Sequence, residues 1–391
     1  MTATPAPDIF TRQTIVSLGA AIACIVTVGI GLSLSIPLLS FALDAKGASR
    51  TLIGLNTAMA GVATIVCAPF ISGWARRFGV HTLLVGATIL AGVSLLAFLV
   101  VEPIWAWFPL RFVFSLALTV LFVLSEYWIN AAAPEHRRGL VLGIYASALS
   151  IGFAAGPFVL IVLGAAGPAP YFAGAALLVL AMLPVLLARA MIPVIEDHPS
   201  AGFVTFLWAA PAATLAALVF GSAETGAFAL LPLYGTAIGL DVAGAATLVS
   251  LMSLGNLAFQ IPIGLIADRI DRRKVLLACG IVGALGMLIA TFVTLPIGWL
   301  RVLLFVWGGI VAALYTVGLA HLGSRFRGAD LAQANAAFVV MYSAGLMIGP
   351  PLAGFGMDLW PPHGLMATFA GLFLIYVAVV LARMARARGT A

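Results

Sequence analysis

Residues 264–274 read Gly-Leu-Ile-Ala-Asp-Arg-Ile-Asp-Arg-Arg-Lys, a short charged segment between two long apolar runs. A related segment, Ser-Gly-Trp-Ala-Arg-Arg-Phe-Gly-Val-His, occupies residues 72–81. When the two are aligned, Arg76 stands 192 residues before Asp268. Charged segments that recur at such a distance indicate an internal repeat of about half the chain.

A glycine motif gives nearly the same offset. Gly152-x-x-x-Gly156-Pro157 precedes Gly345-x-x-x-Gly349-Pro350 by 193 residues. Two agreeing offsets predict two similar halves in the same orientation, an arrangement that transporters build around a cavity at the membrane midplane. The longest polar stretch between apolar runs lies near Ile195–Ala201. We therefore expect an N-terminal half over 1–194, a cytoplasmic linker over 195–202 and a C-terminal half over 203–391.

The composition requires a membrane. Hydrophobic residues make up 63% of the chain, charged residues 8%, and the mean hydropathy is +1.18. A water-soluble domain could not carry this much apolar surface, and each span needs about 20 mainly apolar residues. The fold class is therefore all-α integral membrane, with about twelve transmembrane helices in two six-helix pseudo-symmetric halves. The spans are expected near 14–43, 52–74, 80–101, 105–132, 139–165, 170–193, 204–234, 243–267, 274–295, 298–324, 332–357 and 364–385.

The basic residues indicate the orientation. If the spans alternate from a cytoplasmic N-terminus, fifteen of the nineteen Lys and Arg residues lie inside, and only Lys46, Arg50, Arg111 and Arg301 lie elsewhere. This positive-inside bias places both termini in the cytoplasm of a bacterium, with the chain in its inner membrane. Because the charges occupy short loops, membrane lipids are the expected partners of the +6 net charge, and nucleic acid is not.

No enzyme site emerges from the sequence. The five histidines are dispersed, and the three cysteines, Cys24, Cys67 and Cys279, lie inside spans without CxxC spacing. The sequence shows no spacing typical of a metal-ligand cluster, a nucleophile motif or a phosphate-binding loop. We expect no catalytic residues, no metal and no cofactor, and a monomer that uses a gradient rather than ATP.

The charged segment and the glycine motif resemble the major facilitator superfamily over nearly the whole chain. Gly-x-x-x-Asp-Arg-x-x-Arg-Arg at 264–273 is close to its signature loop, although the first half has Ser72 and Arg76 where glycine and aspartate are usual. Gly143 and the Gly152 motif resemble the antiporter motif until Leu160 and Ile161 replace small residues. Within the superfamily, a further group of segments resembles the YcaD-like, drug–proton antiporter-like bacterial branch: 126–130, 138–139, 315–320 and 329–354.

The resemblance implies gating roles for these motifs. Asp268 would accept hydrogen bonds from a neighbouring helix N-terminus, in a contact that breaks when the cavity opens inward, while the basic residues after it face lipid phosphates. The paired glycines allow close helix approach, either as plain packing or as a rocking interface. The gate candidates are Gly264, Asp268, Arg269, Arg272, Arg76, Arg77, Gly152, Gly156, Pro157, Gly349 and Pro350.

Two acids fall inside the spans. A charged side chain at a helix centre costs roughly 2.5–3.5 kcal/mol, so such acids need partners or water. Glu224 lies in Gly221-Ser-Ala-Glu-Thr-Gly226, among small residues that leave room for a cavity, and is either a proton site or a neutral structural acid. Glu126, with Asn130 one turn further on, either binds proton or substrate or forms a gate salt bridge with Arg76 or Arg77.

Further polar residues inside spans complete the candidate site. Arg111, four residues before Ser115, resembles an arginine motif associated with proton transfer, but it and Arg301 could instead extend to the headgroups. Trp128 and Trp307 are core or cavity wall. Other side chains could bind substrate or join helices: Asn56, Asn256, Gln260, Tyr315 and Tyr342.

We therefore expect a secondary transporter that moves a small amphiphilic molecule by alternating access, as proton-coupled export. Glu224, Glu126, Arg111 and Asn130 are the candidates for coupling or substrate binding. Proton-coupled uptake of a nutrient or cofactor is the alternative. A membrane-embedded sensor or scramblase is a more remote one.

Overall fold

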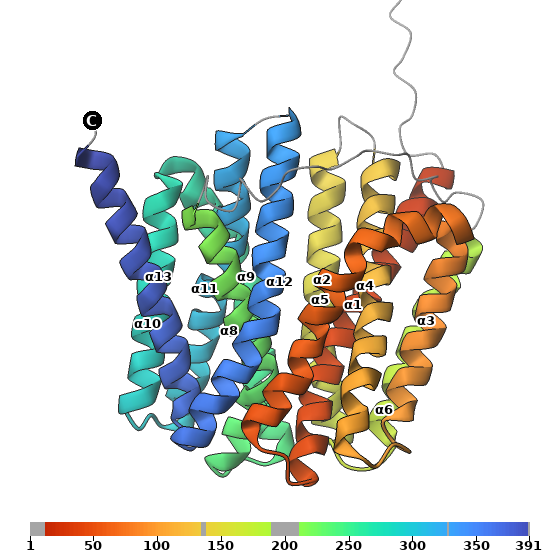
Figure 1. Cartoon of the computed structure of the whole chain (residues 1–391), viewed down its shortest axis with the longest axis horizontal. Helices are drawn as coiled ribbons and strands as arrows, with labels where there is room; N and C mark the ends of the chain where they lie inside the picture. The colour runs from red at the N-terminus through yellow and green to blue at the C-terminus, as the bar shows by residue number, and fades with distance from the viewer. Residues whose placement is uncertain (1–11, 134–137, 189–210, 327, 390–391) are drawn as a thin grey trace, which may run out of the picture.

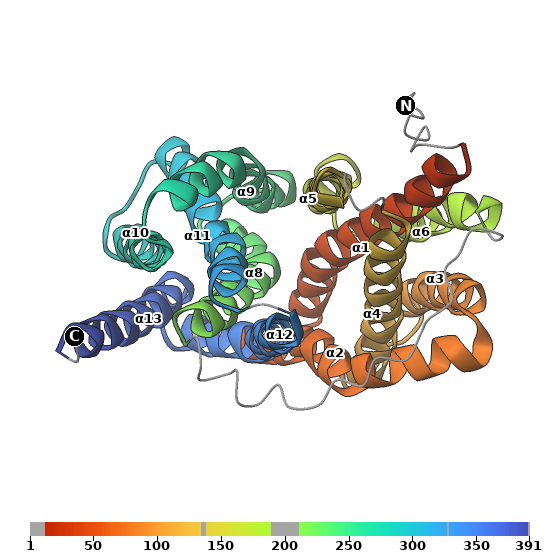
Figure 2. The same ribbon diagram turned by 90° about the horizontal axis from the view of Figure 1, so that it is seen from above.

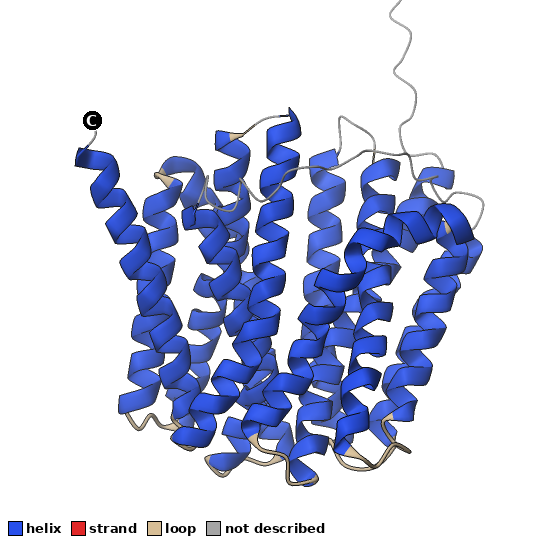
Figure 3. Ribbon diagram, in the orientation of Figure 1, coloured by secondary structure: helices blue, strands red, loops and turns tan. Residues whose placement is uncertain are grey.

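Twelve long helices cross the molecule in the computed structural model, which describes residues 12–133, 138–188, 211–326 and 328–389 (Figure 1). All twelve are long and apolar enough to span a membrane. No strand occurs within these ranges (Figure 3). In hydrocarbon every backbone N–H and C=O must be bonded within the protein, and a helix does this within one segment. The predicted fold class is confirmed.

The first six helices form one group and the last six another (Figure 2). The N half contains α1 (Arg12–Ala45), α2 (Arg50–Phe78), α3 (Val80–Ala97), the short 3-10 helix η1 (Ile104–Ala106), α4 (Trp107–Ala132), α5 (Arg138–Leu163) and α6 (Ala169–Leu187). The C half contains α8 (Pro211–Ala237), α9 (Val242–Arg269), α10 (Arg272–Phe292), α11 (Ile297–Arg325), α12 (Gly328–Leu359) and α13 (Gly364–Gly389). Each predicted span matches one helix within a few residues, except that the end of the sixth span and the start of the seventh lie, like the predicted linker, outside the described ranges.

Local sequence signals set the helix ends. Asp241 begins α9 by accepting a 2.9 Å hydrogen bond from the backbone N–H of Gly244, and Asp271 begins α10 by accepting one from Arg273. Such side chains bond the N–H groups that lack a partner in the first turn. Gly79, with φ of 82°, is the single residue between α2 and α3, a conformation that glycine adopts at low cost.

One set of helix pairs packs within each half, and another set forms the interface between the halves. Within the halves, α1 packs on α5, and α8 packs on α12. Between the halves, α2 packs on α12, and α5 packs on α9. The described ends of α1 and α13 lie at one end of the bundle, called here the terminal face, and the other end is called the opposite face (Figure 1). Helices α2 and α12 meet near the opposite face and diverge toward the terminal face.

Two deep tryptophans belong to the core rather than to a cavity wall. Trp128 is fully buried and donates a 2.9 Å hydrogen bond to Ser17 Oγ. Trp307 donates a 3.1 Å bond to the Gly283 carbonyl and stacks on Phe369. Each indole N–H therefore has a partner within its own half, as buried tryptophans require.

Candidate functional site

Helix α8 carries Glu224 and is buried along most of its length. Small residues on both α8 and α12 allow the two backbones to touch. A Cβ added at Gly349 would lie 2.6 Å from the Ser222 carbonyl carbon, and one at Gly221 would lie 3.0 Å from the Tyr342 ring. Close approach of α8 and α12 brings Tyr342 to Glu224.

The Tyr342 hydroxyl donates a 2.7 Å hydrogen bond to Glu224 Oε2. Both side chains are half-buried. A bond to a charged acceptor is stronger than one between neutral groups, and in a span it replaces water that the carboxylate has lost. An acid inside a span was expected to need a partner, and the partner is the hydroxyl of Tyr342, 118 residues further along the chain.

Four rings surround this bond, and we call Phe220, Tyr315, Phe338 and Tyr342 the aromatic cluster. The ring centroids of Tyr315 and Tyr342 lie 5.3 Å apart, and those of Tyr315 and Phe338 lie 5.1 Å apart, both edge to face. Phe220 stacks on Tyr342 at 6.0 Å. These are favourable aromatic geometries, and they place two hydroxyl groups among otherwise apolar rings.

Glu126 lies on α4 of the N half, and its side chain is exposed. Glu224 lies on α8 of the C half, so the two acids that the sequence singled out belong to different halves.

The gate pairing suggested for Glu126 does not form in this conformation. No ion pair joins Glu126 to Arg76 or Arg77 in the part of the chain that the structure describes. Asn130 donates a 2.8 Å bond to the backbone carbonyl of Glu126, so the two residues do share one helix face. Arg77 lies over the ring of Phe78 at the end of α2.

Arg111 is buried rather than extended to the headgroups, with 1% of its surface exposed. One of its terminal nitrogens donates a long 3.5 Å bond to the Ser35 carbonyl of α1, and its guanidinium faces the ring of Phe114. Among the described residues, Nε and the other terminal nitrogen have no hydrogen-bond partner, and neither has Ser115 Oγ. Arg301, by contrast, is partly exposed at the start of α11.

The remaining polar candidates divide between two places. Tyr315 and Tyr342 belong to the aromatic cluster. Asn56 is buried in α2, and its amide nitrogen lacks a partner within the described ranges. Asn256 and Gln260 are half-buried in α9. No group of three or more metal-binding side chains occurs in the described residues.

The charged segment where α9 ends and α10 begins is bonded differently from the prediction. Asp268 pairs with Arg272 at 3.3 Å, and Arg272 also donates a 3.0 Å bond to the Ala320 carbonyl of α11. We had predicted that Asp268 would bind a helix N-terminus and that Arg272 would face lipid. The short turn between α9 and α10 brings the two side chains together and allows the ion pair instead. A Cβ at Gly264 would meet nothing within 4 Å, so that glycine is not needed for packing here.

The paired glycines pack helices within each half. A Cβ at Gly152 would lie 2.6 Å from the Val26 carbonyl of α1, and Gly156 touches the backbone at Leu34. Gly345 and Gly349 pack in the same way on α8. In this conformation the motifs, each followed by Pro157 or Pro350 inside its helix, correspond to plain close packing rather than to a contact between halves.

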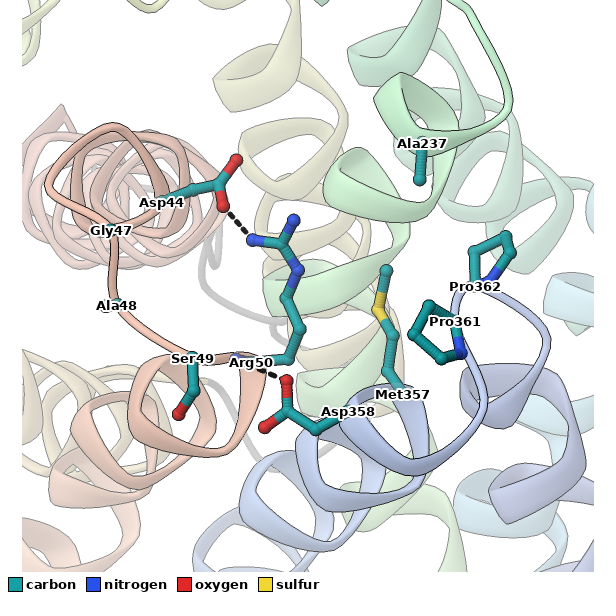
Figure 4. Close-up of a pocket in the computed structure, with 10 residues that line it drawn as sticks. All are labelled: Asp44, Gly47, Ala48, Ser49, Arg50, Ala237, Met357, Asp358, Pro361 and Pro362. Atoms are coloured by element: carbon teal, nitrogen blue, oxygen red, sulfur yellow. Dashed lines mark hydrogen bonds and ion pairs between the residues drawn. The ribbon is translucent and has the colours of Figure 1, made fainter.

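A charged cluster at the opposite face was missed by the sequence reasoning. Figure 4 shows Arg50 between Asp44 and Asp358. Arg50 forms an ion pair with Asp44, and its backbone N–H bonds Asp358 of the other half. Each charge lies at the end of a span, where single charges are ordinarily solvated, so only their arrangement in space reveals the cluster.

Comparisons with known proteins agree on one family. The sequence model of the Major Facilitator Superfamily matches residues 21–243 and 213–390. The uncharacterized MFS-type transporter YfkF of Bacillus subtilis is 25% identical over 368 residues, which cover 91% of this chain and 92% of YfkF. The uncharacterized MFS-type transporter YcaD of Escherichia coli is 24% identical over 285 residues, which cover 71% of this chain and 72% of YcaD.

Solved structures show the same fold. A mutant of the nucleoside transporter NupG superposes with a TM-score of 0.78 at 15% identity, over 95% of this chain and 99% of that one. A bacterial homologue of the human lysosomal transporter Spinster, in an inward-facing and occupied conformation, gives a TM-score of 0.72 at 12% identity, over 95% of both chains.

Proposed function

The chain belongs to the major facilitator superfamily of secondary transporters, and from this we propose that it is a proton-coupled exporter of small amphiphilic molecules. The observation that carries the proposal is the hydrogen bond between Tyr342 and Glu224 inside the aromatic cluster. Glu224 is the proton site. The terminal face is the cytoplasmic one, as the distribution of basic residues predicts.

Two opposing influences suit Glu224 to proton exchange. Loss of water disfavours the charged form of a carboxylate, whereas a hydrogen bond from a hydroxyl stabilises it. A change in the distance between α8 and α12 alters the balance, because each helix supplies one partner of the bond. Helix movement during alternating access therefore changes the proton affinity of this acid.

The aromatic cluster supports an amphiphilic cargo. Its rings offer apolar area, and the hydroxyls of Tyr315 and Tyr342 offer a few hydrogen bonds, the usual composition of a small-molecule site. Glu126, whose side chain is exposed on α4, is the candidate that extends the site into the N half. Export is favoured by the resemblance of Gly143, Gly152 and Gly156 to an antiporter motif.

Transport by purified protein in proteoliposomes tests this proposal. With a pH-sensitive dye inside inside-out-oriented vesicles and an acidic interior, addition of an amphiphilic cargo should release protons from wild type. Glu224→Gln should lose this release but keep cargo-for-cargo exchange, which needs no net proton movement. Glu102→Gln, in an exposed loop, is the matched control and should behave as wild type.

The other outcomes are also informative. Proton release that persists in Glu224→Gln would refute Glu224 as the proton site. Uptake is the second candidate, and it predicts that protons and cargo move together from the opposite face to the terminal face rather than in opposite directions. Failure of both exchange and proton release with every cargo tried would refute amphiphilic export.

A further inference from the structure

At the opposite face, one carboxylate of the C half binds the first turn of a helix in the N half. Asp358, near the end of α12, accepts a 2.9 Å hydrogen bond from the backbone N–H of Arg50 and a 2.8 Å bond from that of Thr51. The hydroxyl of Thr51 donates a third bond to it, at 2.6 Å. These three bonds join residues more than 300 positions apart.

The position suits a carboxylate for a general reason. The first N–H groups of a helix have no partner inside it, and the helix dipole makes this end partly positive. The ordinary N-cap of α2, Ser49, accepts only the N–H of Leu52, at 3.2 Å. Asp358 therefore completes the cap of α2 from the other half of the molecule.

Close packing of backbones accompanies these bonds. A Cβ added at Gly354 would lie 2.9 Å from the Thr51 Cα, and one at Gly54 would lie 2.7 Å from the Pro351 Cα. Neither glycine could carry a side chain without moving the other helix. Asp358 lies at the end of this contact between α2 and α12, and its bonds exist only while the contact is closed.

Arg50 itself stays with the N half. Its guanidinium pairs with Asp44 of α1, while its hydrogen bond to Asp358 comes from the backbone N–H (Figure 4). A cavity of about 360 Å³ adjoins the cluster and is lined also by Met357 and Pro361. Water that enters this space could replace the bonds of Asp358 when the helices part, so the carboxylate need not be left without partners.

We propose that Asp358 is the residue that holds the opposite face closed, by capping α2 across the interface between the halves. It is a positioning residue of the transport cycle, because the cap must break each time this face opens. The proposal goes beyond the proposed function, since it holds whatever cargo is carried and in whichever direction.

Distances between spin labels in full-length protein in nanodiscs test the proposal. One pair, Ala45→Cys with Leu359→Cys, reports on the opposite face, and a second pair, Phe78→Cys with Asp330→Cys, reports on the terminal face. The native cysteines, all buried, are replaced by alanine. Asp358→Ala should lengthen the distance at the opposite face and shorten the one at the terminal face, with the closed-to-open ratio falling at least tenfold.

Three further variants separate this role from general loosening. Thr51→Val removes one of the three bonds and should give an intermediate shift. Asp358→Glu should partly restore the closed population. Asp44→Asn removes a carboxylate that binds Arg50 within the N half only, and it should leave both distances unchanged. These readouts need no transport, so they stand apart from the test of the proposed function.

Two results would overturn the proposal. Unchanged distances in Asp358→Ala would mean that the glycine contacts alone hold the face closed. Longer distances at both faces would mean that Asp358 stabilises the fold rather than one conformation. If Asp358→Ala does not fold, the same criteria apply to Thr51→Val, whose loss is a single hydroxyl.

Discussion

Replacing Gly349 by alanine tests whether contact between the backbones of α8 and α12 positions the Glu224 site. An alanine Cβ would lie 2.6 Å from the Ser222 carbonyl carbon and closer still to the Ser222 Cα and carbonyl oxygen, whereas ordinary contacts begin near 3.4 Å. The two helices must therefore separate by more than about 0.8 Å. Overpacking of this kind costs about 1–3 kcal/mol, and the better helix propensity of alanine offsets about 1 kcal/mol of it.

The same displacement acts on the site. Tyr342 lies on α12 two turns from Gly349, and its 2.7 Å bond to Glu224 must lengthen when α12 moves away from α8. We expect Gly349→Ala to lower the free energy of unfolding by up to about 2 kcal/mol, and therefore the unfolding temperature. It should also lose proton-coupled transport more strongly than cargo binding.

Thermal unfolding in detergent, followed by circular dichroism at 222 nm, measures the first effect, and the proteoliposome assay measures the second. Gly371→Ala is the control, because its Cβ would meet nothing within 4 Å, and this variant should be as stable as wild type or more so. If Gly349→Ala proves at least as stable as Gly371→Ala, the inferred backbone contact does not determine packing here.

The remaining predictions concern three other contacts. Arg111→Met keeps a side chain of similar size and removes a buried charge, so the free energy of unfolding should stay the same or rise by about 1–4 kcal/mol. Loss of transport in this stable variant would assign Arg111 a functional role rather than a structural one. Trp307→Phe should lower the free energy of unfolding by about 1 kcal/mol through loss of the bond to Gly283, and no change in the melting curve would refute that bond. Arg272→Gln should loosen α9 and α10 from α11 by removing the bond to Ala320, and hydrogen exchange at the terminal end of α11 should rise; equal exchange in wild type would contradict it.

The spans and the repeat could be predicted because their signals are local. Apolar runs of membrane length and two matching offsets require no knowledge of contacts. The acids inside spans could also be identified, since Glu224 and Glu126 are rare residues in an apolar surrounding. Their partners could not, because Tyr342 reaches Glu224 only through the packing of α12 on α8, across 118 residues.

The partners of charged residues at the span ends could not be predicted from the sequence either. The sequence suggested that Asp268 and Arg272 had separate partners, and the structure pairs them across the short turn between α9 and α10. Asp358 gave no signal at all. A single acid after a glycine-rich span is typical of an ordinary solvated loop end, and only the position of α2 makes it a cap.

The cap of α2 also has a consequence for the order of biosynthesis. Arg50 leaves the ribosome 308 residues before Asp358, which at about 5–20 residues per second is a delay of roughly 15–60 s. During that time α2 can enter the membrane with its first N–H groups bonded only to water and Ser49. Helix α12 thus completes the first turn of a helix made much earlier, and closure of the opposite face becomes a step that must follow the synthesis of α12.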